Sequence, residues 1–342
     1  MQLKTMADLI GNTPLVRINS LCDDATGFQV FGKLESLNPG YSVKDRSARG
    51  LLEQAIEDHD LKPGAIIVES SSGNMGHALA MLCATLGFHF ICVLDPKTPK
   101  TNASLVKAYG GVVVMIDTPD ATGSYQKRRI ATAKQIAREM PNCINLDQYS
   151  NPAAIEVHYR TTGPELLHQT RTRIDVLIAS VSTGSHLSGT AKFLKEKLPD
   201  IKVIGVEPVG SIVFGGIYQP FLQNGTGLSF RPGNILEQYV DEVRRVADID
   251  AFRVCRELAR KDGLLLGGSS GSVLHVAQSL RSAVNKPCNI VVILPDGGLK
   301  YLETVYDDRW LEEHGLGALL ENSTDKLPLP QPEDDQLVWR RA

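Results

Sequence analysis

Long apolar runs and an excess of positive charge are both missing from this sequence. No window approaches the roughly 18 to 20 apolar residues that cross a bilayer, and residues 1–11 lack the basic stretch and apolar core of a secretory signal. Lys and Arg number 36 against 39 Asp and Glu, a formal net charge of −3, so no basic surface for nucleic acid is expected. We therefore expect a cytoplasmic protein whose partners are small molecules, with no nucleic-acid or membrane partner.

Paired cysteines and metal-ligand patterns are missing as well. The six cysteines are scattered without a C-x-x-C pair, and several lie inside apolar runs, so we interpret them as reduced packing residues. None of the eight histidines belongs to a pair with metal-ligand spacing. The sequence therefore predicts no metal site.

What the sequence does contain is a repeated α/β pattern. Its 342 residues are 42% hydrophobic and 22% charged, enough for two lobes with cores of their own. Short apolar runs alternate with helical patterns, which favours parallel sheets. Expected strands cover residues 65–69, 88–94, 112–116, 175–181, 202–206 and 289–294, and expected helices cover 77–86, 102–109, 125–139, 187–198, 251–262 and 273–284. Residues 321–342 have no periodic apolar face and are predicted to be a flexible tail.

Three loops carry the chemical argument, because each passes from a strand into a helix, where parallel sheets bind ligands. Residues 180–185 are small, so their amides could hold a phosphate, although such a loop by itself is more often a turn. Residues 70–76 include three serines and Asn74 and could bind a carboxylate, although alone they would be interpreted as a helix cap. Residues 38–46 place Lys44 at a helix start, where a lowered pKa suits an amine that acts as nucleophile or base.

Together these loops have the order and spacing of the cysteine synthase and cystathionine β-synthase family. The matching segments are residues 10–15, 38–46, 72–74, 158–165, 182–185, 267–271 and 293–296. The chain resembles this family from about residue 7 to about residue 311. The resemblance implies fold type II, the tryptophan synthase β-like α/β fold with two parallel-sheet domains. A large domain would comprise residues 1–43 and 150–320, and a small mobile domain would comprise residues 44–149.

Carried over position by position, the resemblance implies pyridoxal 5′-phosphate as cofactor. Lys44 would hold it as a Schiff base and later remove the substrate α-proton. Asn74 matches the partner of the cofactor's phenolic oxygen, and Ser269 matches the partner of its pyridine nitrogen, where a neutral serine favours β-elimination over transamination. The phosphate loop matches Ser182, Thr183, Gly184, Ser185 and His186, and the substrate positions match Ser71, Ser72, Asn74, Met75, Gln148, Tyr149 and, again, Ser182.

Departures from the cysteine synthase pattern concern the second substrate. Met75 stands where those enzymes typically have threonine, Ser182 where they have glycine, and Tyr149 where they have phenylalanine. With residues 210–215 and 301–310, these positions look more like the branch that joins O-phospho-L-serine and L-glutamate through an α-aminoacrylate. The product of that branch supplies 2,3-diaminopropionate for siderophores. A dicarboxylic amino acid needs hydrogen-bond donors, which Ser182 and Tyr149 could supply.

Two other interpretations stay open. A cysteine synthase would use sulfide with O-acetylserine or O-phosphoserine, and Met75 and Ser182 count against it. A non-enzymatic scaffold would usually lose the lysine, yet Lys44, Asn74 and Ser269 are all present. The sequence does not identify the leaving group as phosphate or acetate. The family also implies a homodimer.

Overall fold

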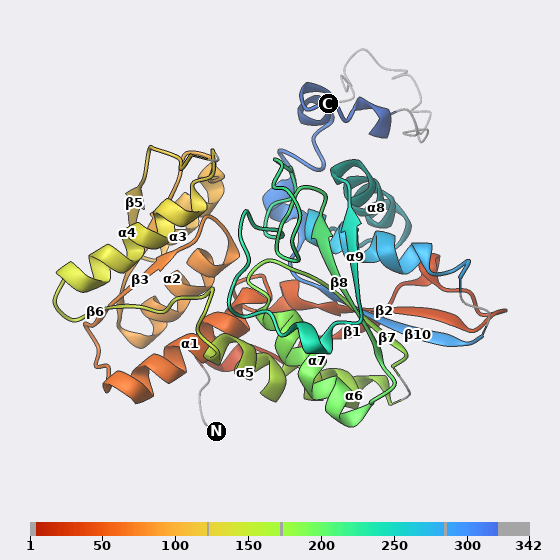
Figure 1. Cartoon of the computed structure of the whole chain (residues 1–342), viewed down its shortest axis with the longest axis horizontal. Coiled ribbons are helices and arrows are strands. Elements are labelled where there is room, and N and C mark those ends of the chain that lie inside the picture. Colours follow the sequence, from red (N-terminus) through yellow and green to blue (C-terminus); the bar gives the residue numbers. More distant parts are fainter. Residues whose placement is uncertain (1–4, 122, 172–173, 284–285, 321–342) are drawn as a thin grey trace, which may run out of the picture.

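Two lobes, each built on a sheet, make up the computed structural model, which describes residues 5–121, 123–171, 174–283 and 286–320 (Figure 1). One sheet has six strands in the order β1-β2-β10-β7-β8-β9, in which only β1 runs antiparallel to its neighbour. The other has four parallel strands in the order β5-β4-β3-β6. The predicted α/β class with two parallel sheets is confirmed. The predicted tail, residues 321–342, lies outside the described residues.

The six-stranded lobe has helices on both faces of its sheet. Alternate side chains of a strand point to opposite faces, so Ile178 and Val292 belong to one core while Leu177 and Val291 belong to the other. Central strands covered on both faces must be apolar throughout. The strands are β1 (Leu15–Arg17), β2 (Phe28–Leu34), β7 (Val176–Ser180), β8 (Lys202–Pro208), β9 (Glu242–Val246) and β10 (Cys288–Leu294), and the helices are α5 (Ala153–Arg160), α6 (Thr162–Thr170), α7 (Ser185–Lys197), α8 (Asp248–Lys261), α9 (Gly268–Ser279) and α10 (Asp308–Glu313).

The four-stranded lobe is inserted in the chain between β2 and β7. Its strands are β3 (Ile66–Ser70), β4 (His89–Leu94), β5 (Val112–Met115) and β6 (Cys143–Asn145), with α2 (Asn74–Leu86), α3 (Lys100–Ala108) and α4 (Gln126–Glu139) around them. Helix α1 (Lys44–His59) lies at the junction, where it contacts α2 of this lobe and α5 of the other. The exact domain division at residues 43/44 and 149/150 stays a prediction.

Several elements begin elsewhere than predicted or were not predicted. Helix α2 begins at Asn74 instead of residue 77, and α9 begins at Gly268 instead of residue 273. Apart from Met75, their first turns consist of small and polar residues, which give no periodic apolar signal. Strand β6 is only three residues long, and β9 carries two exposed arginines at the edge of the sheet. Both lack the apolar run that identified β3, β4, β5, β7, β8 and β10, and β1 and β2 were not predicted either.

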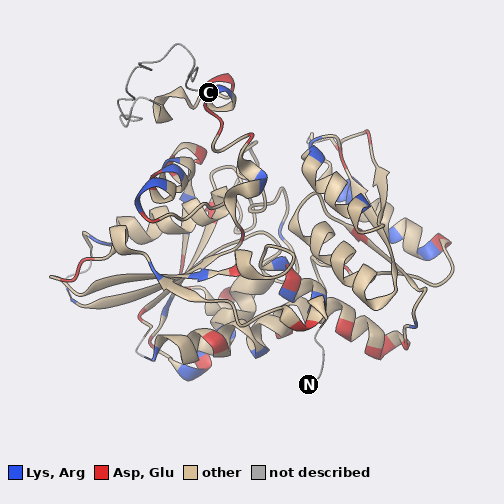
Figure 2. Cartoon of the chain, turned by 180° about the vertical axis from the view of Figure 1, so that it is seen from behind, with Lys and Arg blue, Asp and Glu red and all other residues tan. Residues whose placement is uncertain are grey.

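The surface and the cysteines fit an ordinary globular chain. Basic and acidic residues are interspersed on the outer helices of both lobes (Figure 2). All six cysteines are free, and Cys83, Cys92, Cys255 and Cys288 are buried. Within the described ranges, no helix is long and apolar enough to cross a membrane, and no group of three or more His, Cys, Asp or Glu side chains could hold a metal ion.

Candidate active site

Lys44 is the first residue of α1 and lines a cavity between the two lobes. Its Nζ donates a hydrogen bond to Oγ1 of Thr183, at 2.9 Å. Burial lowers the pKa of the Lys44 ammonium to about 8, although the nearby Glu69 carboxylate opposes the shift. An amine with a pKa this close to neutrality can act as a nucleophile and as a base.

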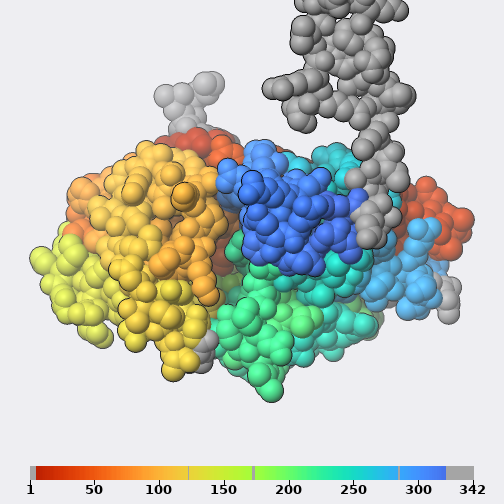
Figure 3. All heavy atoms as spheres, turned by 90° about the horizontal axis from the view of Figure 1, so that it is seen from above, coloured from red at the N-terminus to blue at the C-terminus, as the bar shows by residue number. Residues whose placement is uncertain are grey.

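The cavity has a volume of about 270 Å³. Seen from above, the four-stranded lobe in orange and yellow meets the six-stranded lobe in green and blue along a seam (Figure 3). Residues from both lobes form its walls, so the cavity lies between them. The predicted site residues on its walls are Lys44, Ser71, Ser72, Asn74, Met75, Gln148, Tyr149, Ser182 and Thr183.

The serine loop between β3 and α2 is held in one shape by internal hydrogen bonds. The Oγ of Ser71 accepts from the amide of Gly76, at 2.9 Å. The side-chain amide of Gln148 donates to the carbonyl of Ser70, at 2.8 Å. The backbone amide of Gln148 donates to the buried carboxylate of Glu69, at 3.1 Å. A rigid loop with small side chains at a helix N-terminus suits a carboxylate ligand.

The loop before α7 requires glycine at its turn. Gly184 has a φ of +89°, and a Cβ at this position would come within 2.3 Å of Ile235 and 2.7 Å of the carbonyl oxygen of Asn234. The hydroxyl of Ser188 donates to the same carbonyl, at 2.8 Å. The first turn of α7 is thereby fixed with its amides toward the end of β7, which favours an anion there.

Three predicted cofactor positions, Gly184, Ser185 and His186, are not among the residues that line the cavity, and neither is Ser269. Ser185, His186 and Ser269 are buried, the last in the first turn of α9. Burial lowers the pKa of the His186 imidazole to about 3, and the Nε2 atom is buried without a hydrogen-bond partner. The roles of these residues stay predictions.

Arg129 and Asp95 are among the charged side chains on the cavity wall that the sequence did not single out, and both lie near the start of α4. Arg129 is only 3% exposed, and its Nε lies 3.1 Å from Oδ2 of Asp95. Its Nε and Nη1 have no hydrogen-bond partner. Arg129 follows two other basic residues, so nothing in the sequence distinguishes it. Asp95 directly follows β4, and its place at the carboxyl end of a parallel strand was a usable signal.

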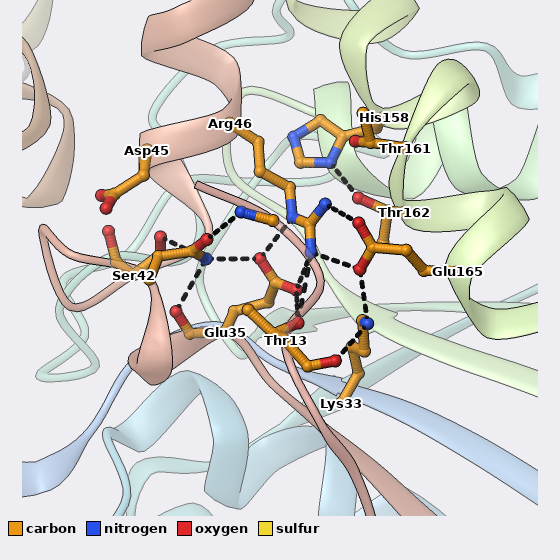
Figure 4. A network of polar contacts seen from close by, with 12 residues as sticks. Thr13, Lys33, Glu35, Ser42, Asp45, Arg46, His158, Thr161, Thr162 and Glu165 are labelled. Carbon is orange, nitrogen blue, oxygen red and sulfur yellow. Dashed lines mark hydrogen bonds and ion pairs between the residues drawn. The ribbon is translucent and has the colours of Figure 1, made fainter. Parts of the chain in front are cut away.

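A buried ionic network, the Arg46 cluster, lies on the far side of the first turn of α1. Arg46 donates through Nε to Glu35, at 2.8 Å, and through Nη1 to Glu165, at 2.6 Å. Lys33 pairs with Glu165 at 2.6 Å, and Thr13 donates to Glu35 at 2.7 Å. Figure 4 shows Arg46 between the two carboxylates. The cluster joins the residues before β1, the end of β2, α1 and α6 and so holds the backbone that carries Lys44.

The site fits pyridoxal phosphate by its donor set. Lys44 supplies an amine of lowered pKa inside the cavity. The α7 loop supplies helix amides, and Gly184 permits a turn that a Cβ would block by a clash with Ile235 and Asn234. Asn74 and the serine loop supply neutral donors on the opposite wall.

Comparison with known proteins agrees with this chemistry. A family model described as pyridoxal-phosphate dependent enzyme matches residues 6–296. The chain is 38% identical to the N-(2-amino-2-carboxyethyl)-L-glutamate synthase of Ralstonia nicotianae over 334 residues, which cover 97% of this chain and 98% of the relative. It is also 38% identical to the enzyme of the same name from Cupriavidus metallidurans over 314 residues, 91% and 92% of the two chains.

A solved structure extends the comparison to the fold. The crystal structure of O-ureido-L-serine synthase superposes with a TM-score of 0.83 at 31% sequence identity, covering 91% of this chain and 100% of that one. The similarity therefore includes both lobes.

Proposed function

Because the chain belongs to the family of pyridoxal-phosphate dependent enzymes, we propose that it joins O-phospho-L-serine and L-glutamate into N-(2-amino-2-carboxyethyl)-L-glutamate by β-replacement. The observation that carries the choice of donor is Arg129, a buried guanidinium on the cavity wall that pairs with Asp95 through Nε and whose Nη1 makes no hydrogen bond. The two relatives at 38% identity carry the name of this activity.

Pyridoxal phosphate supplies the electron sink that lets a β-substituent leave an amino acid. In this proposal Lys44 holds the cofactor covalently, and the loop of residues 182–186 with the start of α7 holds its phosphate. Asn74 donates to the phenolic oxygen, and Ser269 bonds the ring nitrogen. The intact set of these residues also argues against a non-enzymatic scaffold.

The amino-acid donor binds by its carboxylate at the serine loop. Ser71, Ser72 and the first amides of α2 face the cavity next to Gln148. Lys44 would then take the α-proton, because an amine whose pKa burial lowers to about 8 is present as the free base in a much larger fraction near neutral pH than an ordinary lysine. The carboxylate bound at residues 71–75 draws the four-stranded lobe toward the cofactor and excludes water.

Arg129 and Lys97 bind the leaving phosphate in this proposal. Both line the cavity, at the end that the α4 start and the β4 loop form. A guanidinium recognises phosphate through two parallel hydrogen bonds, whereas an acetyl ester offers no charge for it to pair with. A buried Arg129 therefore supports a phosphorylated donor over an acetylated one.

The second substrate meets Ser182 and Tyr149. Ser182 lies at the opening of the phosphate loop and is partly exposed. Tyr149 is buried with its ring against Phe230, at a centroid distance of 5.3 Å. Sulfide needs neither hydroxyl, while glutamate has two carboxylates that need donors.

The experiment offers purified enzyme O-phosphoserine or O-acetylserine, each with glutamate and sulfide in competition, and identifies products by mass spectrometry. We expect the glutamate adduct from O-phosphoserine. Cysteine as the main product would replace this proposal with a cysteine synthase.

A variant pair tests the donor separately. Arg129→Gln should raise KM for O-phosphoserine by about tenfold or more, the effect of losing hydrogen bonds to a charged group, with a smaller effect on O-acetylserine. The neighbouring Arg128 is exposed, and Arg128→Gln is the matched control. Equal losses with both donors would remove Arg129 from the choice of leaving group.

The proposal also includes that the enzyme is a homodimer and that it works in the cytoplasm. Its product would supply 2,3-diaminopropionate. Size-exclusion chromatography with light scattering tests the dimer, and a monomeric mass would contradict it.

A further inference from the structure

Lys300 is a charged residue of the cavity wall that the proposed chemistry does not use. It belongs to the turn η5 (Gly298–Tyr301), directly after β10 in the six-stranded lobe. Its ammonium donates a hydrogen bond to Oδ1 of Asn74, which begins α2 in the four-stranded lobe. The contact therefore connects the two lobes at the cavity.

The amide of Asn74 is held at both ends. Its Oδ1 accepts from Lys300, and its Nδ2 donates to Oδ2 of Asp296, at 2.7 Å. The hydroxyl of Tyr301 donates to the same oxygen of Asp296, at 2.7 Å. One amide hydrogen of Asn74 remains, and Nδ2 lies on the side of Gly225, 4.0 Å from where a Cβ of that cavity residue would stand. Since an amide can rotate by 180°, these partners decide which end faces the cavity.

Lys300 also lies near two buried carboxyl groups that its positive charge can stabilise. Asp45 and Asp296 are each 1% exposed or less, and each has an Oδ1 without a hydrogen-bond partner. The Lys300 ammonium lies 3.7 Å from Asp296. Burial raises the pKa of Asp45 to about 7, and Lys300 is among the charges that oppose this rise. The same ammonium helps burial lower the pKa of His77, to about 4. Removing Lys300 would leave the Asp296 carboxylate without its nearest cation.

We infer that Lys300 is a positioning residue, which holds the Asn74 amide with its N–H toward the cofactor's phenolic oxygen. It acts through Asn74 and touches no reacting atom. The inference rests on the cofactor and on no particular nucleophile, so it can fail or hold independently of glutamate as the second substrate.

The test compares Lys300→Met, Lys300→Arg and the surface control Lys107→Met. For Lys300→Met we expect the affinity of the apoprotein for pyridoxal phosphate to fall about tenfold, as for one lost hydrogen bond with a charged group. We also expect a change in the absorption spectrum of the bound cofactor and in the pH dependence of that spectrum. Lys300→Arg should restore most of both, because a guanidinium can donate to the same oxygen. An unchanged spectrum and pH profile in Lys300→Met would overturn the inference.

A double-mutant cycle with Asn74→Ala separates positioning from a general loss of structure. If Lys300 acts through Asn74, adding Lys300→Met to Asn74→Ala should change cofactor affinity by less than about twofold. Fully additive losses would contradict the inference. Lys300→Gln, which keeps a donor without the charge, serves if Lys300→Met does not fold, and thermal unfolding of each apoprotein shows which variants fold. If Lys300→Gln has the spectrum and pH profile of the wild type, the hydrogen bond alone positions Asn74. If Lys300→Gln restores them only in part, the charge of Lys300 contributes as well.

Discussion

At the scale of single residues, Lys44 combines a position at the start of α1 with a buried amine. Lys44→Ala should lower turnover by about 10²- to 10⁴-fold or more, because the base is lost together with the covalent attachment of the cofactor. Steady-state kinetics with either amino-acid donor measures this. Lys107→Ala on the surface is the control, and turnover by Lys44→Ala at the rate of the control would disprove the role of Lys44.

Ser182 tests the choice of nucleophile. Ser182→Gly should weaken the use of glutamate by about ten- to a hundredfold, the effect of losing one hydrogen bond to a charged group. Sulfide should be affected much less. The measurement is kcat/KM with O-phosphoserine and each nucleophile, after cofactor binding has been shown to be unchanged. Equal losses for both nucleophiles would mean that Ser182 serves the cofactor.

Glu69 gives the protein a specific dependence on pH. Burial raises the pKa of its carboxyl to about 7, although the hydrogen bonds that it accepts from two backbone amides oppose this rise. A raised pKa means that the folded state binds the proton more tightly, so this contribution is complete below the ordinary pKa and is lost as pH rises through about 7. We expect about 1 to 3 kcal/mol of unfolding free energy from this source.

The measurement is urea unfolding of the apoprotein from about pH 5 to pH 8, with the wild type compared to Glu69→Gln. The comparison is needed because buried histidines such as His186, whose pKa burial lowers, destabilise the fold as pH falls. Glu69→Gln should be less stable than the wild type, since one hydrogen-bond acceptor is replaced. Its unfolding free energy should nevertheless fall less steeply as pH rises. Parallel curves for the two proteins would show that Glu69 does not titrate in this range.

The sequence predicted the residues that stand in small-residue loops, and it missed Asp95, which directly follows β4, and the charged residues that reach the site from elsewhere. Lys44, the serine loop and Thr183 lie on the cavity wall as expected. Arg129 comes from the side of a helix, and Lys300 from a turn after the last strand. Their approach to the cavity depends on how the two lobes pack, which no local pattern of residues encodes.

At the scale of elements, the start of α7 depends on the backbone of Gly184. Gly184→Ala should abolish or strongly weaken cofactor binding, because the methyl group would clash with Ile235 and the backbone of Asn234. Gly64 also has a positive φ, of +89°, but nothing lies within 4 Å of its would-be Cβ. Gly64→Ala is therefore the matched control for backbone strain. Cofactor titration of both variants is the measurement, and similar behaviour would show that strain, not the clash, matters.

The predicted boundaries of helices and strands agree with the structure where an apolar run marks the element. Strands covered on both faces, such as β7 and β10, stand out as apolar runs, and their predicted bounds agree with the structure within one residue. The first turns of α2 and α9 were missed because they are rich in small and polar residues, which give no periodic apolar signal. At Gly271, a Cβ would meet the carbonyl oxygen of Ala251 at 2.1 Å. Gly271, which in the sequence resembles a loop residue, is therefore a site where α9 packs closely against α8.

At the scale of the whole molecule, the Arg46 cluster joins the end of β2 to α1 and α6. Burial would raise the pKa of the Glu35 carboxyl, yet Arg46 outweighs burial and holds it below its usual value. Arg46→Met should cost about 3 to 5 kcal/mol of unfolding free energy, because it leaves two carboxylates without their main partner. Arg49→Met removes the exposed pair with Glu53 in the same helix and should cost less than about 1 kcal/mol. Chemical unfolding measures both, and equal costs would show that the cluster adds no stability.

The pairing of β10 has a consequence for synthesis on the ribosome. Residues 288–294 lie between β2 and β7 and pair with both, so the six-stranded sheet has a gap until they emerge. The four-stranded sheet needs only residues 66–145 and is complete much earlier. Non-local pairing of this kind is slow, and a nascent chain with an open sheet exposes strand edges that aggregate. The inserted lobe can thus fold first, while the cofactor meets a finished site only when nearly the whole chain has been made.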